Sequence, residues 1–266
     1  MKIVIIAREE PVFMGPFLIK LIEARRNEIK LLALGSLREA GPKPKTFWAN
    51  LERLYAYWLL FELRGFARVL LTRLWWYILR FLGPWGEPFD RFSLDRAAKR
   101  LKIPLRHIKN PNDEDFLKKL KAIEPDLIFN QSDYMMKSEL LNIPRSGVVN
   151  RHGSLLPKHR GRVASFWSHL EGKYGVTIHF VDEGIDSGPI ILQKELQIDP
   201  CSCYFRVLKS VFDASYAIAN EAFNQLEAGT VNLMPNKIEE GSIHRFPTIA
   251  ELKEYRKIIK ERRKED

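Results

Sequence analysis

The amino-acid sequence predicts an α/β protein whose sheet is mostly parallel. Short apolar runs rich in β-branched residues, typical of buried strands, alternate with segments in which apolar residues recur at helical spacing. This alternation is the usual pattern of a parallel sheet covered by helices. With 266 residues, 45% hydrophobic and 29% charged, the chain can bury one sizeable core.

The first half of the chain starts the alternation and resumes it after a long interruption. Residues 2–7 form an apolar run, residues 11–26 follow at helical spacing, and residues 29–35 form a second run that a glycine stops. Beyond the interruption we expect helices at 92–103 and 112–123 and strands at 104–108 and 126–130.

The second half continues the pattern and ends in a polar tail. No internal repeat or low-complexity linker divides it. The simplest partition is one domain over residues 1–200, followed by a long helix and a C-terminal extension over 201–266. We expect strands at 147–152, 174–182 and 188–198, and helical segments at 138–143, 163–172, 204–226 and 250–266.

Residues 47–85 interrupt the alternation with an aromatic segment. They hold 12 of the 30 aromatic residues, and the longest run without a charge has eight residues. A helix that crosses a bilayer needs about 20 apolar residues, so we expect two amphipathic helices, broken near Gly65 and ended by Gly83-Pro84. We expect these aromatic residues to pack on the sheet or to form a homodimer contact. Peripheral contact with a membrane is the alternative, because Trp beside Arg suits a membrane interface.

The formal net charge is +10 and unevenly distributed. Residues 42–100 carry 11 Lys and Arg against 5 Asp and Glu, which favours an anionic partner: a phosphate-bearing substrate, tRNA or a membrane. Cys201 and Cys203 are too close together for a disulfide framework and make a poor metal site. The apolar stretch before Arg8 is too short for a signal peptide. We therefore expect a cytoplasmic protein without a bound metal.

Polar side chains follow two of the expected strands. Asn150 and His152 begin the segment 150–157, and Asp186 lies in the segment 181–188. Open α/β sheets bind ligands at the carboxyl ends of their strands, so an amide, an imidazole and a carboxylate are expected to converge there. This set suits attack on a carbonyl group. Asn150 and His152 would stabilise the charge on oxygen, and Asp186 would orient the imidazole or take a proton through water.

Three motifs follow one another in order. They are Asn-x-His-x-Ser-Leu-Leu-Pro at 150–157 with Arg-Gly at 160–161, Gly-Val-Thr-Ile-His at 175–179, and Val-Asp-Glu-Gly-Ile-Asp-Ser-Gly at 181–188. Together they resemble the folate-dependent formyltransferases, which include methionyl-tRNA formyltransferase, sugar N-formyltransferases and glycinamide ribonucleotide transformylase. The resemblance implies a Rossmann-like sheet, and transfer of a formyl group from 10-formyltetrahydrofolate to a primary amine.

The resemblance also implies roles for single residues. Asn150, His152 and Asp186 match the catalytic residues of the family. His179 is expected, from its place in an alternating strand, to be a packed residue rather than a catalyst. The residues expected to hold the pterin of the co-substrate are Tyr134, Met135, Met136, Ser154, Leu155, Val181, Asp182, Glu183 and Gly184.

Departures from the family pattern bear on the acceptor amine. Residues 7–10 lack a glycine-rich phosphate loop, which argues against glycinamide ribonucleotide. About 66 residues follow the sheet, short for the C-terminal barrel of a methionyl-tRNA formyltransferase, and the tail at 241–248 is similar to that of sugar-modifying members. We therefore expect an amino sugar, small or nucleotide-linked, as acceptor. Weaker candidates for binding its anionic group are Arg8, His159 and Arg160.

Three other functions stay open. Formylation of methionyl-tRNA would suit the positive charge. Hydrolysis of 10-formyltetrahydrofolate would use the same three residues with water as the acceptor, although the first strand begins at Lys2, without the extra domain of known deformylases. A non-catalytic scaffold or membrane-surface protein built around residues 47–85 belongs to another class, and the intact set of amide, imidazole and carboxylate argues against it.

Overall fold

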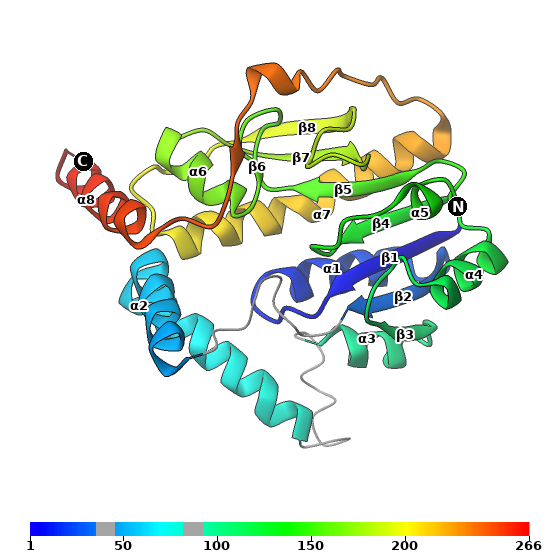
Figure 1. Cartoon of the computed structure of the whole chain (residues 1–266), viewed down its shortest axis with the longest axis horizontal. Helices are drawn as coiled ribbons and strands as arrows, with labels where there is room; N and C mark the ends of the chain where they lie inside the picture. Colours follow the sequence, from blue (N-terminus) through cyan, green and yellow to red (C-terminus); the bar gives the residue numbers. More distant parts are fainter. Residues whose placement is uncertain (36–45, 82–92, 266) are drawn as a thin grey trace.

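A seven-stranded sheet forms the centre of the molecule (Figure 1). The computed structural model describes residues 1–35, 46–81 and 93–265. The strand order is β3-β2-β1-β4-β5-β7-β8; the first five strands are parallel, β7 is antiparallel to β5, and β8 is antiparallel to β7. The predicted mostly parallel α/β sheet is confirmed. The strands are β1 (Ile3–Arg8), β2 (Ile29–Gly35), β3 (Leu105–Ile108), β4 (Leu127–Gln131), β5 (Val148–His152), β7 (Tyr174–Phe180) and β8 (Ile190–Leu196).

Helices cover both faces of the sheet. Ile3 and Ile5 of β1 belong to the core on the face of α1 (Met14–Ala24), α3 (Leu94–Arg100) and α7 (Tyr204–Ala228). Val4 and Ile6 belong to the core on the face of α4 (Glu114–Ile123) and α5 (Ser138–Leu141). Burial on both faces explains why the strands are continuous apolar runs instead of alternating ones.

The aromatic insertion is helix α2 (Phe47–Phe81), and it bends sharply inside. The bend lies at Glu62 (φ 58°, ψ 172°), so the expected break near Gly65 is wrong by three positions. Gly65 serves packing instead, since a Cβ there would lie 3.0 Å from the Cβ of Phe205 on α7. Glu62 accepts hydrogen bonds from both terminal nitrogens of Arg263, at 2.8 and 3.1 Å, which fixes the bend against α8 (Ile249–Glu265). The expected end at Gly83-Pro84 lies outside the described residues.

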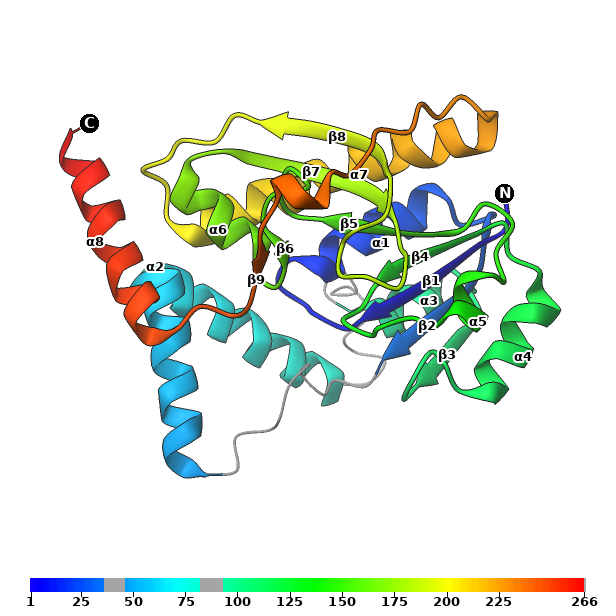
Figure 2. The same cartoon turned by 45° about the horizontal axis from the view of Figure 1, so that its top comes forward.

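A second, two-stranded sheet was not expected. It pairs β6 (Arg160–Gly161), in the loop after β5, with β9 (Ile243–His244), which lies on the chain between η2 (Ile238–Glu240) and the C-terminal helix (Figure 2). The chain then runs into α8, which packs with α2, α6 (Ala164–Glu171) and the start of α7 in an aromatic core. Residues 201–266 therefore share their packing with the sheet region.

Candidate active site

A cavity of about 630 Å³ lies at the carboxyl ends of β4 and β5. Parallel strands of an open α/β sheet place their ligands at this edge. Helices α1 and α7 contribute Met14, Tyr204, Leu208 and Phe212 to its wall. Most other lining residues come from the segments 130–136, 150–153, 161–165, 184–186 and 243–245.

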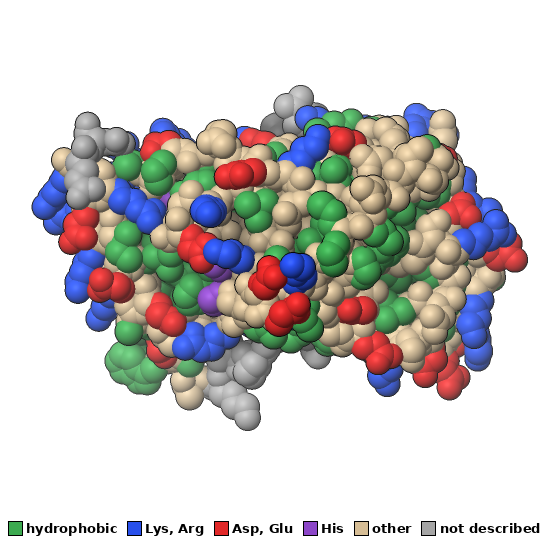
Figure 3. Space-filling model, turned by 90° about the horizontal axis from the view of Figure 1, so that it is seen from above, with side chains coloured by type: hydrophobic (Ala, Val, Ile, Leu, Met, Phe, Trp, Pro, Cys, Tyr) green, Lys and Arg blue, Asp and Glu red, His purple; other side chains and the backbone are tan. Residues whose placement is uncertain are grey.

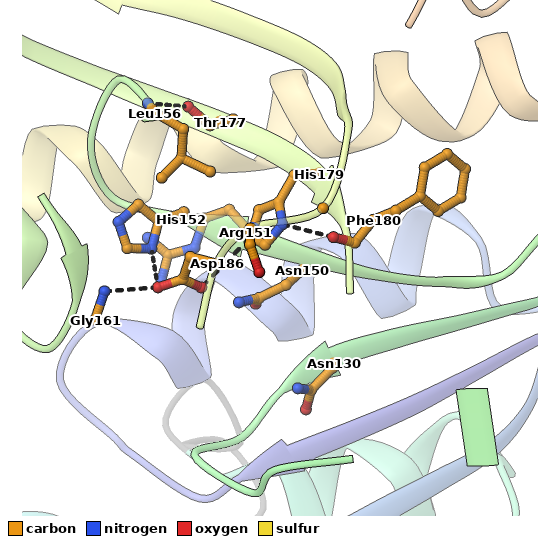
Figure 4. Close-up of polar contacts among 12 residues, drawn as sticks. Asn130, Asn150, Arg151, His152, Leu156, Gly161, Thr177, His179, Phe180 and Asp186 are labelled. Carbon is orange, nitrogen blue, oxygen red and sulfur yellow. Dashed lines mark hydrogen bonds and ion pairs between the residues drawn. The ribbon is translucent and has the colours of Figure 1, made fainter. Parts of the chain in front are cut away.

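Asp186 is held at the centre of the site by three neighbours. Its backbone has a φ of 47°, a conformation that Asp tolerates better than most residues. Its Oδ2 atom accepts the Gly161 N–H at 2.8 Å and lies 3.3 Å from His152 Nδ1 (Figure 4). Its Oδ1 atom lies 3.5 Å from His179 Nε2. The structure thus brings the expected His152 and Asp186 together and adds His179 to them.

The ring of His152 has acceptors at both nitrogens. Nε2 lies 2.8 Å from the carbonyl oxygen of His159, which only accepts, so Nε2 carries a proton. Burial lowers the pKa of His152 below 6.5, although the Asp186 carboxylate opposes this. Near pH 7 the ring is therefore neutral, and its Nδ1 lone pair faces the carboxylate. Nδ1 is the nitrogen that takes up a further proton.

His179 repeats this arrangement on the other side of Asp186. Its Nδ1 donates to the carbonyl oxygen of Phe180 at 2.7 Å, which leaves Nε2 facing the carboxylate. Burial by itself would raise the pKa of Asp186, but the positive charge that His152 and His179 carry when protonated, together with the Gly161 N–H, holds it well below its ordinary value. Two imidazoles and a carboxylate therefore surround a position that attracts one proton.

Asn150 is oriented by its neighbours on β4 and β5. Arg151 Nε, which only donates, bonds Gln131 Oε1 at 3.2 Å, so the amide nitrogen of Gln131 points the other way. This nitrogen donates to Asn150 Oδ1 at 2.8 Å. Because the amide oxygen of Asn150 is engaged with Gln131, its N–H groups are available to a molecule bound in the cavity that it lines. In this geometry Asn150 can donate a hydrogen bond into the cavity, whereas both nitrogens of His152 already face protein acceptors.

The residues expected to hold the pterin divide into two groups. Tyr134, Met135 and Met136 line the cavity, as do Val181, Asp182 and Gly184. The structure does not bring the other three there. Ser154 is fully buried and donates to the Lys158 carbonyl oxygen, and the Leu155 side chain packs against Gly175. Glu183 is exposed and is not among the residues that line the cavity.

The weaker candidates for the anionic group lie off the cavity wall. Arg8 is paired with Asp133. The ring of His159 contacts His244 at 3.2 Å and Glu171 at 3.4 Å. Arg160 is buried and donates to the Ile238 carbonyl oxygen at 3.3 Å. Their neighbours Arg162, His244 and Arg245 line the cavity instead, because strand β9 lies on the loop that carries β6.

Sequence reasoning missed the part played by His179 and Gln131. Side chains alternate between the two faces along β7, so the sequence shows which residues share a face with His179. It does not show that this face borders the cavity, which follows only from the pairing of His179 with Asn150 on β5. Gln131 directly follows the strand that the sequence predicts at residues 126–130. This position at a strand end is the one sequence signal that could have identified Gln131 as a residue of the site. Within the described ranges, no group of three His, Cys, Asp or Glu residues is placed to hold a metal ion.

Comparison with known proteins places this site in context. The family model described as formyl transferase matches residues 94–222. Methionyl-tRNA formyltransferase from Thermodesulfovibrio yellowstonii is 38% identical over 117 residues, covering 43% of this chain and 38% of that protein. Methionyl-tRNA formyltransferase from Thermotoga maritima is 31% identical over 140 residues, covering 52% and 45%. The chain thus spans less than half the length of these curated relatives.

Solved structures match the fold over nearly the whole chain. Glycinamide ribonucleotide transformylase 1 from Symbiobacterium toebii is 17% identical with a TM-score of 0.57, covering 89% of this chain and 92% of that one. A sugar N-formyltransferase from a Shewanella species is 16% identical with a TM-score of 0.52, covering 92% and 76%. At these identities the likeness concerns the fold.

Proposed function

We propose that this chain, whose residues 94–222 match the formyl transferase family model, transfers a formyl group from 10-formyltetrahydrofolate to a primary amine. The observation that carries this proposal is the convergence of Asn150, His152 and Asp186 on one cavity. Acyl transfer to an amine requires a hydrogen-bond donor that stabilises the oxyanion and a base that accepts the proton of the amine. The Asn150 amide and the cluster around Asp186 can supply them.

The cavity offers a fitting place for the pterin of the formyl donor. Residues 134–136 line it, and within the described part of the chain their backbone N–H groups have no protein acceptor. Met136 is buried and adds an apolar wall. Main-chain donors beside apolar side chains are a usual way to bind a flat heterocycle. When bound, the donor supplies an electrophilic formyl carbon.

The residues of the chain then divide the work. Asn150 donates a hydrogen bond to the oxygen on which negative charge develops. His152 and Asp186, with His179 behind them, accept the proton that the amine loses, through an intervening water. His152 holds this proton at Nδ1, where the Asp186 carboxylate stabilises the imidazolium at 3.3 Å. As the amine nitrogen bonds to the formyl carbon and the bond from that carbon to the folate nitrogen breaks, the cluster returns the proton to the folate nitrogen, which regenerates the neutral ring. The same cluster would serve hydrolysis if water took the place of the amine.

For the acceptor we favour an amino sugar that carries a phosphate or nucleotide. Support comes from the wall formed by Arg162, His244 and Arg245, since guanidinium groups suit phosphate and the imidazole suits hydroxyl groups. Methionyl-tRNA is the second candidate, favoured by the names of the relatives that match in sequence. A homodimer contact or peripheral membrane contact through residues 47–85 is compatible with either acceptor.

A formyl-transfer assay tests the proposal. Purified protein with 10-formyltetrahydrofolate is offered a panel of nucleotide-linked amino sugars and, separately, charged initiator tRNA, and products are identified by mass spectrometry. Formylation of an amino sugar is the expected result. Formyl-methionyl-tRNA would keep the reaction and change the acceptor, formate released without any amine would indicate a hydrolase, and an unconsumed donor throughout the panel would refute formyl transfer.

Replacement of Gln131 tests the orientation of Asn150. In Gln131→Glu the new carboxylate only accepts, so the Asn150 amide is expected to turn its N–H groups toward it and away from the cavity. Turnover should fall by about 10²-fold, as for loss of one oxyanion donor, with little change in KM. Gln131→Met, which leaves Asn150 free to turn, is the matched control and should lose less. Equal losses in the two variants would contradict the orienting role.

A further inference from the structure

Helix α2 carries an unusual concentration of exposed apolar side chains. Thirteen of the nineteen large apolar residues that are exposed in the described part of the chain belong to it. Large exposed apolar patches on a soluble protein usually mark an interaction site. We call this set the α2 surface: Phe47, Trp48, Leu51, Leu54, Tyr55, Trp58, Leu63, Leu70, Leu71, Leu74, Trp75, Tyr77 and Ile78.

The α2 surface is a second apolar face of a helix that already has one. Ala56, Leu59 and Leu60 before the bend and Val69 after it are buried in the aromatic core with α7 and α8. A helix on the surface of a globular protein normally turns polar residues outward, and one that is apolar all round is buried. Trp76, only 4% exposed, points inward, whereas Trp48 is 76% exposed. The outward face of α2 therefore calls for an apolar partner.

The charges around this surface are mainly positive. Residues 47–81 contain five arginines against Glu52 and Glu62, and Glu62 is already paired with Arg263. On the adjoining helix α8, Lys253 lies 6.0 Å from the ring of Tyr55, and Arg256 lies 5.8 Å from the ring of Trp58. On the face turned away from α2, acidic and basic side chains are interspersed instead (Figure 3).

We propose that the α2 surface binds an anionic lipid bilayer, with both arms of the helix lying in the interface. Leu and Trp side chains would enter the boundary between headgroups and acyl chains, and the arginines would meet lipid phosphates. None of the described helices is long and apolar enough to cross a membrane.

Charge and side-chain type distinguish the bilayer from other partners. A second copy of the chain, joined about a two-fold axis, would place two identical positive surfaces against each other. Residues 47–81 contain only two acids to offset this charge, and Glu62 is already paired with Arg263, which leaves Glu52. A nucleic acid would use the arginines and leave exposed leucines such as Leu63, Leu70 and Leu71 without apolar contacts. An anionic bilayer satisfies both kinds of side chain at once.

Docking would set the cavity close to the bilayer. The ring of Phe61 on α2 lies 5.4 Å from that of Tyr204 on α7, and Tyr204 also lines the cavity. Glu62 and Arg263 tie the two arms to α8, so the surface and the cavity are parts of one packed unit. An enzyme docked in this way would meet acceptors carried at the membrane.

Vesicle sedimentation tests the proposal without any assay of activity. The full chain is mixed with vesicles of phosphatidylcholine alone or mixed with phosphatidylglycerol. We expect sedimentation with the anionic vesicles that weakens as salt is raised, and about tenfold or greater loss in Leu71→Ser/Leu74→Ser. Leu71 and Leu74 are 63% and 53% exposed, so the variant should keep its melting temperature.

The control is Leu233→Ser, which removes a leucine that is 48% exposed away from α2. It should bind vesicles as the unchanged protein does. Absence of binding to anionic vesicles at low salt would overturn the proposal. A dimer in solution that Leu71→Ser/Leu74→Ser converts to a monomer would also overturn it, in favour of a second copy as the partner. Both outcomes are independent of the formyl-transfer assay.

Discussion

The Asp186→Asn variant is expected to lose on the order of 10²–10⁴ in turnover while keeping its fold. The amide can still accept the Gly161 N–H, and Asn tolerates the φ of 47° at this position. What disappears is the charge that raises the pKa of His152. Without it the ring takes up a proton less readily, and the imidazolium formed during the reaction has no counter-charge.

Single-turnover formyl transfer, with the amine that the panel identifies, measures this loss. Asp213→Asn is the matched control, because it makes the same chemical change on an exposed residue of α7 that pairs with Lys209. Equal melting temperatures for the two variants would show that the loss is catalytic. A loss of less than about tenfold in Asp186→Asn would remove the carboxylate from the proton-accepting cluster.

Replacement of Asn150 by Asp is expected to cost about 10²–10³ in turnover. The new side chain can still accept the hydrogen bond from Gln131, so its position is kept. Its second oxygen, however, replaces the N–H donor and opposes the negative charge that develops on the formyl oxygen. The effect should fall on kcat, since the donor acts where charge appears.

Asn142→Asp is the control for this charge change, because Asn142 is an exposed residue at the end of α5. It should retain full turnover. If Asn150→Asp instead raised KM and left kcat unchanged, Asn150 would be a binding residue and the oxyanion would need another donor.

The elements that the sequence predicted well are those with a local physical cause. Residues 3–7 are an apolar run because β1 is buried on both faces, and that burial shows directly in the sequence. Asn150 and His152 lie at the carboxyl end of a parallel strand, the edge that the fold class predicts. Asp186 reaches the same place by another route, because β7 is antiparallel to β5 and the segment after β7 folds back to Gly161 and His152.

The features that the sequence did not predict depend on contacts between distant segments. Strands β6 and β9 have two residues each, too few to show a period, and they are stabilised by hydrogen bonds across more than 80 positions: the Arg160 N–H to the Ser242 carbonyl and the Arg162 N–H to the His244 carbonyl. Glycine is a common place for a helix to break, but Gly65 is needed for close approach to α7. The bend lies instead at Glu62, whose carboxylate binds Arg263, about 200 positions away in the sequence.

The origin of the cavity wall in β9 has an evolutionary consequence. Asn150, His152 and Asp186 lie inside residues 94–222, the stretch that the formyl transferase family shares, whereas Ile243, His244 and Arg245 lie outside it. The residues proposed for catalysis and the wall proposed to face the acceptor are therefore encoded in separate stretches and can diverge at different rates. Exchange of the wall would leave the residues proposed for catalysis in place, so we expect similarity within residues 94–222 to follow the reaction more closely than the choice of amine.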